Sequence, residues 1–86
     1  MFNLHRWSVY EDIVICTYVV NRDNDPKTLK KLADMMGIPF NKVAFRACNF
    51  SKLAKGYTSI WKFSKQERDV FEWVTRNRTI KFKTLL

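Results

Sequence analysis

Apolar and polar positions follow the period of amphipathic helices in four segments of the chain, which are separated by short polar or glycine-containing stretches. Ser8 and Glu11 form a capping-box pattern, so we expect a first helix from Val9 to about Asn21. The run IVICTYVV inside it is rich in β-branched residues, which leaves a buried strand as the alternative. The acidic pair Glu11–Asp12, at the positive end of such a helix, favours the helix.

A second helix is predicted to begin after Asp25, whose side chain can cap it, with Pro26 at its first position. Gly37 is expected to end this helix. Its apolar positions share one face and are Leu29, Leu32, Ala33 and Met36.

The spacing of Ala33, Gly37 and Val43 is that of a helix-turn-helix. The small residue lets the two helices approach, the glycine can adopt the left-handed turn conformation, and the aliphatic residue anchors the next helix. A third helix is therefore predicted from Phe40 or Asn41 onward, ending at Gly56. Its apolar face is expected to hold Val43, Ala47, Phe50 and Ala54.

The last third of the chain contains a second capping box, Ser64 with Glu67, which predicts a fourth helix to about Arg76. Residues 57–63 look extended, and residues 79–85 alternate like a strand that can pair with them. The expected fold is mainly α: a three-helix helix-turn-helix bundle, a fourth helix and a small two-stranded β element, as in a winged-helix variant. At 86 residues the chain is expected to form a single domain, residues 1–86.

Positive charge is concentrated in the middle of the chain. Residues 1–38 are net zero, residues 39–63 are +5 with no acidic side chain, and residues 64–86 are +3, which gives the net charge of +8. A helix that carries basic side chains and no acidic ones is typical of a protein that binds a polyanion. A solvated basic face without a ligand is the alternative.

Several classes of function fit the composition poorly. The chain has one histidine, two cysteines without metal-ligand spacing and no glycine-rich phosphate loop, so we expect no enzymatic activity, metal or cofactor. Three acidic residues, Glu11, Asp25 and Glu67, are explained by helix capping. No membrane span or signal peptide is expected, and the cysteines are expected to be reduced, in a cytoplasmic setting.

The third helix carries side chains that suit the major groove of DNA. Asn pairs with adenine, Arg with guanine, and an aromatic edge contacts a thymine methyl. The predicted base contacts are Asn41, Phe45, Arg46 and Asn49. The predicted phosphate contacts are Lys27, Thr28, Lys42, Lys52, Lys55 and Lys62. Alternatives stay open for three of these residues: Phe45 in the core, Arg46 in a salt bridge with Asp34, and Asn49 bonded to backbone.

Three segments of the chain resemble a known protein family. Trp7-Ser8 with Glu11-Asp12, then LADMMG and KVAFRACNFSKL, is similar to the Myb/SANT-like trihelical pattern. The stretch 43–73 also resembles small prokaryotic and phage helix-turn-helix domains, some of which precede HNH nucleases. The resemblance implies a DNA-binding module, here free-standing, with Val43 buried and Lys42, Arg46 and Asn49 facing DNA.

The sequence thus predicts sequence-specific binding of double-stranded DNA by a small transcriptional regulator of phage, plasmid or prophage type. One helix-turn-helix makes few base contacts, so a homodimer on a two-fold site is expected. Its interface would be the apolar surface of the first helix, formed by Tyr10, Ile15, Tyr18 and Val19. The alternative to this interface is that the fourth helix and the C-terminal segment cover this surface within the monomer. The alternative is a protein-interaction module, such as a host-factor inhibitor or adaptor, or an RNA binder that uses the same basic surface.

Overall fold

The computed structural model describes residues 6–21, 23, 25–56 and 63–77, and these residues form four helices. They are α1 (Val9–Val20), α2 (Pro26–Met36), α3 (Phe40–Ala54) and α4 (Lys65–Arg76). The prediction of a mainly helical fold is confirmed, and the helix bounds agree with the predicted ones to within about two residues. Of the two segments predicted to pair as strands, only Phe63 is described, so the β element stays a prediction. None of the described helices is long and apolar enough to cross a membrane.

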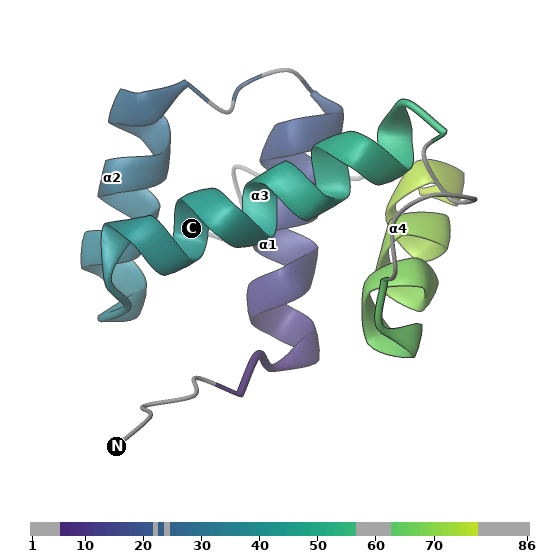
Figure 1. Ribbon diagram of the computed structural model, residues 1–86, viewed down its shortest axis with the longest axis horizontal. Helices are drawn as coiled ribbons and strands as arrows, with labels where there is room; N and C mark the ends of the chain where they lie inside the picture. The colour runs from purple at the N-terminus through teal and green to yellow at the C-terminus, as the bar shows by residue number, and fades with distance from the viewer. Residues whose placement is uncertain (1–5, 22, 24, 57–62, 78–86) are drawn as a thin grey trace.

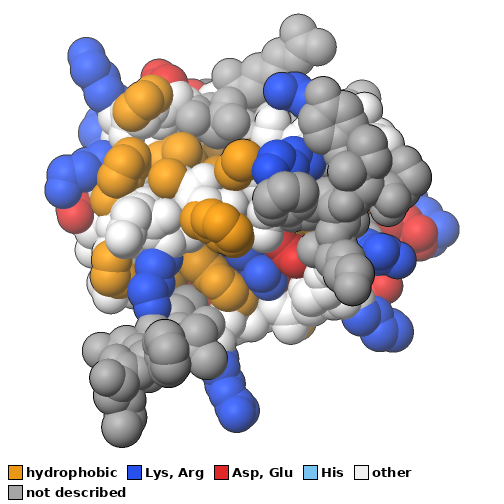
Figure 2. Space-filling view, in the orientation of Figure 1, with side chains coloured by type: hydrophobic (Ala, Val, Ile, Leu, Met, Phe, Trp, Pro, Cys, Tyr) orange, Lys and Arg blue, Asp and Glu red, His pale blue; other side chains and the backbone are white. Residues whose placement is uncertain are grey.

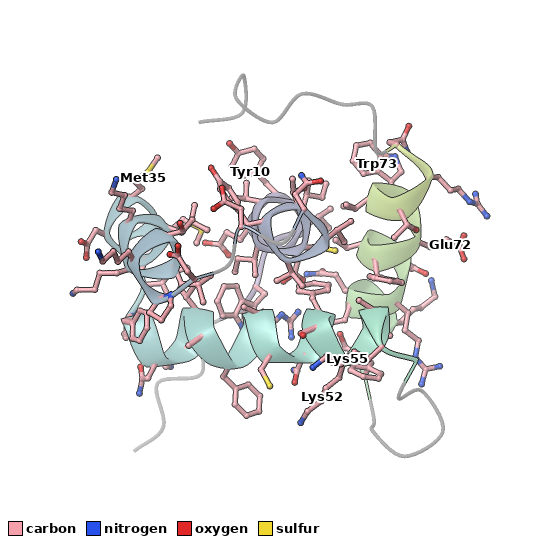
Figure 3. The ribbon with its side chains drawn as sticks, turned by 90° about the horizontal axis from the view of Figure 1, so that it is seen from above. Tyr10, Met35, Lys52, Lys55, Glu72 and Trp73 are labelled. Atoms are coloured by element: carbon pink, nitrogen blue, oxygen red, sulfur yellow. The ribbon has the colours of Figure 1, made fainter. Side chains whose placement is uncertain are left out.

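The helices are arranged around a crossing of α3 over α1. In Figure 1, α3 passes in front of α1, with α2 at one end and α4 at the other. Seen from above, α2, α1 and α4 lie side by side along the same face of α3 (Figure 3). Contacts join α1 to α3 and α4, and α2 to α3. Among the described residues, no other helix lies on the opposite face of α3, which we call its uncovered face (Figure 3).

Helix α1 is central, which explains why a run rich in β-branched residues is helical. Its buried side chains are Asp12, Val14, Ile15, Cys16, Thr17 and Val19, and they lie on several sides of the helix. A helix that is apolar on most sides is stable when neighbours cover it on most sides. This packing also corrects the predicted dimer interface, because Ile15 and Val19 are buried within the monomer. Tyr10 alone of the proposed interface residues is exposed.

Both predicted capping boxes are present. The Oγ of Ser8 accepts the backbone N–H of Glu11 at 3.1 Å, and the Glu11 carboxylate accepts the N–H of Ser8 at 2.9 Å. Ser64 and Glu67 make the same pair of bonds at the start of α4, at 3.1 and 2.9 Å. Each box satisfies two of the backbone donors that a helix start leaves unpaired, so the sequence motif fixes where α1 and α4 begin.

The turn between α2 and α3 depends on Gly37, which has a φ of 68°. A residue with a Cβ would cost about 1–2 kcal/mol in this left-handed conformation. The N–H of Ile38 donates back to the carbonyl of Ala33 at 3.0 Å and closes the end of α2. Ala33 and Val43, on either side of the turn, are both buried, as the spacing predicts. The turn thus sets the direction in which α3 leaves α2.

Candidate nucleic-acid interface on α3

The uncovered face of α3 carries a stripe of side chains that we call the α3 stripe. Its members are spaced by four, three, four and three residues, which keeps them on one side of a helix. They are Asn41, Phe45, Cys48, Lys52 and Lys55. All except the half-buried Lys52 are exposed. In Figure 3, Lys52 extends from α3 on the side away from the other helices.

Phe45 is the most exposed large apolar side chain among the described residues, at 63%. The alternative placement of Phe45 in the core is therefore wrong. In Figure 2, which faces α3, apolar side chains gather over this side of the molecule and Lys and Arg side chains surround them. A contiguous exposed apolar patch with a polar or charged rim is typical of an interaction surface.

Arg46, by contrast, points into the molecule, and its prediction as a base contact is wrong in this structure. Its side chain is only 13% exposed. Its Nε and one terminal nitrogen donate to the two carboxylate oxygens of Asp12 at 2.8 and 2.7 Å. The other terminal nitrogen lies 3.2 Å from a carboxylate oxygen of Glu67, and the guanidinium sits 5.3 Å from the ring centre of Trp7. The predicted partner Asp34 is instead 3.9 Å from Lys30.

Asn49 is also buried and makes a bond to a side chain, so its prediction as a base contact is wrong. Its amide nitrogen donates to Oε2 of Glu67 at 2.9 Å. Oε1 of the same carboxylate accepts the capping bond from Ser64. One glutamate thus caps α4 and holds α3. Gln66 adds a further link, because its amide donates to Asp12 at 2.6 Å and to the Trp7 carbonyl at 2.8 Å.

We call this cluster the buried polar network; its members are Trp7, Asp12, Arg46, Asn49, Gln66 and Glu67. No buried side-chain nitrogen or oxygen of the described residues lacks a partner. The network joins α1, α3 and α4 through charge-assisted bonds, which are the strong ones. It therefore fixes the rotation of α3 about its own axis, and so fixes which side chains the α3 stripe presents.

The predicted phosphate contacts divide into three groups. Lys42, Lys52 and Lys55 lie on α3 or directly after it, and no acidic residue occurs between residues 40 and 56. Lys62 lies outside the described residues. Lys27, the remaining lysine, is exposed in the first turn of α2.

Thr28 does not fit a phosphate site. Its backbone N–H donates to Asp25 at 2.8 Å, and its hydroxyl is 3.4 Å from a carboxylate oxygen of Asp23. The bond from Thr28 lowers the pKa of the Asp25 carboxyl, which therefore stays ionised to lower pH than usual. Two carboxylates at this helix end repel a phosphate, so the prediction that Thr28 and Lys27 hold one is corrected. Helix α3 differs, since it begins after Pro39 without a side-chain cap.

The two cysteines have different surroundings. Cys16 is buried, and burial raises the pKa of its thiol to about 12, so its thiolate does not form near neutral pH. Cys48 is exposed on the α3 stripe. Within the described part of the chain, no three His, Cys, Asp or Glu side chains are grouped so that they could hold a metal ion.

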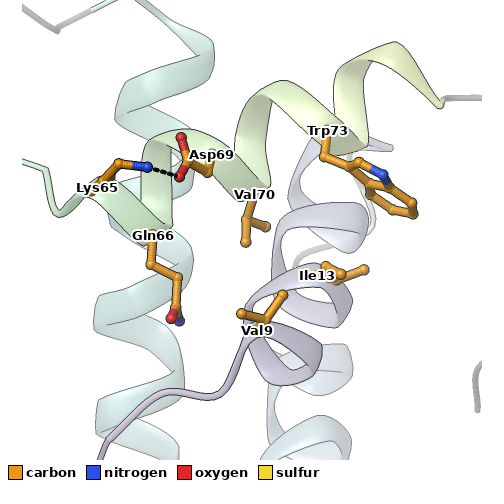
Figure 4. Close-up of a pocket in the computed structure, with 7 residues that line it drawn as sticks. All are labelled: Val9, Ile13, Lys65, Gln66, Asp69, Val70 and Trp73. Atoms are coloured by element: carbon orange, nitrogen blue, oxygen red, sulfur yellow. Dashed lines mark hydrogen bonds and ion pairs between the residues drawn. The ribbon is translucent and has the colours of Figure 1, made fainter.

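A second surface feature is a groove of about 470 Å³ between α1 and α4. Val9, Ile13, Val70 and Trp73 give it an apolar wall, and Lys65, Gln66 and Asp69 line the rest (Figure 4). Lys65 and Asp69 pair with each other at 2.7 Å. In Figure 3, Trp73 and Tyr10 project on the side of the molecule opposite to Lys52. The groove and the α3 stripe are therefore separate surfaces.

Comparisons of the chain with protein-family models, with curated proteins and with solved structures gave no match. The assignment of a function therefore depends on the surfaces described above.

Proposed function

We propose that this protein binds double-stranded DNA by laying the α3 stripe into the major groove. The observation that carries the proposal is the uncovered face of α3, where an exposed Phe45 and lysines occur with no acidic residue. Helix α3 follows α2 after a three-residue turn, which is the arrangement of a helix-turn-helix. In that motif the second helix enters the major groove.

Charge supports a polyanion as the ligand. The chain has eight acidic residues, and all of them lie outside α3. Three acidic residues on the other helices pair with a cation on the same helix, as Asp34 does with Lys30, Asp69 with Lys65 and Glu72 with Arg76. The charge of Arg46 is compensated inside the molecule, so the proposed phosphate contacts on α3 or directly after it are Lys42, Lys52 and Lys55.

The proposal includes the biological role suggested by the resemblance. The protein is a small transcriptional regulator of phage, plasmid or prophage type, which acts in the cytoplasm by occupying an operator. A homodimer would add contacts, but not through the α1–α4 groove. That interface would point the two α3 stripes in opposite directions, whereas two half-sites on one duplex need both on the same side.

The test is the salt dependence of binding to a random-sequence duplex. Replacing Lys42, Lys52 and Lys55 together by Gln removes three phosphate contacts. We expect the slope of log Kobs against log salt to become less steep by about 2.7, with affinity at 0.15 M salt falling on the order of 100-fold.

The matched control is Lys30, Lys65 and Arg76→Gln, which removes the same charge from exposed side chains of α2 and α4, outside the α3 face. It should change the slope by less than 1. If both triple variants lose the same amount, general net charge and not the α3 face holds the DNA, and the proposal is wrong.

A protein-interaction module is the second candidate, and the exposed Phe45 favours it, because apolar side chains also anchor protein interfaces. An RNA ligand is less compatible, since the deep and narrow major groove of A-form RNA does not admit a helix. A binder of a protein partner would show neither the salt slope of a DNA binder nor its dependence on the three lysines.

A further inference from the structure

The buried polar network holds Arg46 and Asn49 inside the molecule, so neither side chain is available to contact bases from the α3 stripe. Arg46 would be the reader of guanine, and its guanidinium is engaged by Asp12 and Glu67. Asn49 is engaged by Glu67 as well. In a helix-turn-helix the N-terminal residues of the second helix contact base edges. On that half of α3, the stripe offers two side chains to bases, Asn41 and Phe45.

Each of these two side chains matches a group of an A·T pair. In the major groove an Asn amide bonds bidentately to adenine N7 and N6. The thymine methyl is the one apolar group that a base edge displays there. A G·C pair would set polar edges against the phenyl ring of Phe45, and those edges would lose water without gaining a hydrogen bond. Phe45 thus favours thymine and also disfavours G·C.

The spacing along the helix sets the distance between the two contacts. Asn41 and Phe45 are four residues apart on α3, about 6 Å along the helix axis. Successive base pairs are about 3.4 Å apart, so the two contacts lie within about two base-pair steps. In the proposed docking, Lys52 and Lys55, at the other end of the stripe, would contact phosphates.

We infer that the α3 stripe selects A·T base pairs, with Phe45 against a thymine methyl and Asn41 on an adenine about two steps away. This inference depends on the proposed DNA binding and adds the class of base that the surface recognises. It differs from the expectation from sequence, which included a guanine contact by Arg46.

The test uses deoxyuridine in place of thymidine, which removes the methyl group and keeps the base pairing. The probes are a duplex of mixed A·T sequence, the same duplex with every thymine replaced by uracil, and a G·C duplex of equal length. We expect the unchanged protein to bind the thymine duplex best and to lose about fourfold in affinity for each methyl group that it contacts. Phe45→Ala should bind the thymine and uracil duplexes equally.

Met35→Ala is the matched control, because Met35 is exposed to a similar degree and projects on the side opposite to Lys52 (Figure 3). It should keep the discrimination of the unchanged protein. Equal binding of thymine and uracil duplexes by the unchanged protein would overturn the inference and leave DNA binding intact. Persistent discrimination in Phe45→Ala would overturn it too. Absence of binding to all three duplexes would instead refute the proposed function, and the inference with it.

Discussion

Replacing Arg46 with alanine is expected to destabilise the fold by about 3–5 kcal/mol, because it leaves the carboxyl groups of Asp12 and Glu67 buried without their cation. A chain of this length has a stability of roughly 5–10 kcal/mol, so the variant should lose about half of its stability. The expected loss is therefore of stability, and DNA binding should fall only to the extent that the variant unfolds.

Urea denaturation followed by circular dichroism measures this loss. The control is Arg76→Ala, which removes the same side chain from an exposed pair with Glu72 and should change stability by less than about 0.5 kcal/mol. A triple variant, Arg46→Met with Asp12→Asn and Glu67→Gln, should recover part of the stability because it no longer buries unpaired carboxyl groups. If Arg46→Ala keeps full stability and loses only base selectivity, Arg46 is a DNA contact and the buried network is incorrect.

Replacing Phe50 with alanine should have an effect of similar size, about 3–5 kcal/mol, for a different reason. Phe50 is fully buried in the core formed by the helices, so its removal leaves a cavity and loses the burial of a phenyl ring. The comparison within the same helix is Phe45→Ala, whose side chain is mostly exposed. That variant should remain within about 0.5 kcal/mol of the unchanged protein.

Thermal and urea denaturation of the two variants would show which side chain lies on the buried face of α3 and which lies on its exposed face. The expected result is a large drop in midpoint for Phe50→Ala and almost none for Phe45→Ala. Equal destabilisation would mean that Phe45 also packs against the fold, and the α3 stripe would then lose its central member.

The helices themselves could be predicted from the sequence because their ends carry local chemistry. Ser8 and Ser64 cap helices with a glutamate three residues on, Asp25 caps the next, and Gly37 ends it; all of these bonds form between near neighbours. Helix α1 was the harder case, since its β-branched run alone favours a strand. The capping box of Ser8 and Glu11 predicted the helix correctly. The helices that pack around α1 stabilise it.

The rotation of α3 could not be predicted in the same way. Helical spacing groups Asn41, Phe45 and Asn49 near one another, but it does not say where the buried face ends. That boundary is set by Asp12 and Glu67, which lie 34 residues before and 21 residues after Arg46 in the sequence. Charged side chains are seldom buried without partners, so a single arginine on a helix is assigned to the surface by default. An acidic residue at an inward-facing position of α1 was the signal that could have revealed the pair.

Without Arg46 and Asn49, the proposed DNA-binding surface is smaller than the one predicted from the sequence, but its side chains are better defined. The α3 stripe is held from behind by charge-assisted bonds, and a surface supported in this way keeps its side chains in one geometry. Asn41, Phe45 and three lysines then carry the whole proposed interaction. Such a small contact set predicts modest affinity for a monomer and a strong dependence on salt.

The most direct measurement is a titration of ¹⁵N-labelled protein with a duplex of mixed A·T sequence at 0.15 M salt, followed by amide chemical shifts. We expect the largest shifts at Asn41, Phe45, Cys48 and Lys52, and little change at the groove residues Val9, Ile13, Val70 and Trp73. Shifts centred on the groove between α1 and α4, or no shifts at all with the protein folded, would contradict the assignment of α3 as the DNA-binding helix.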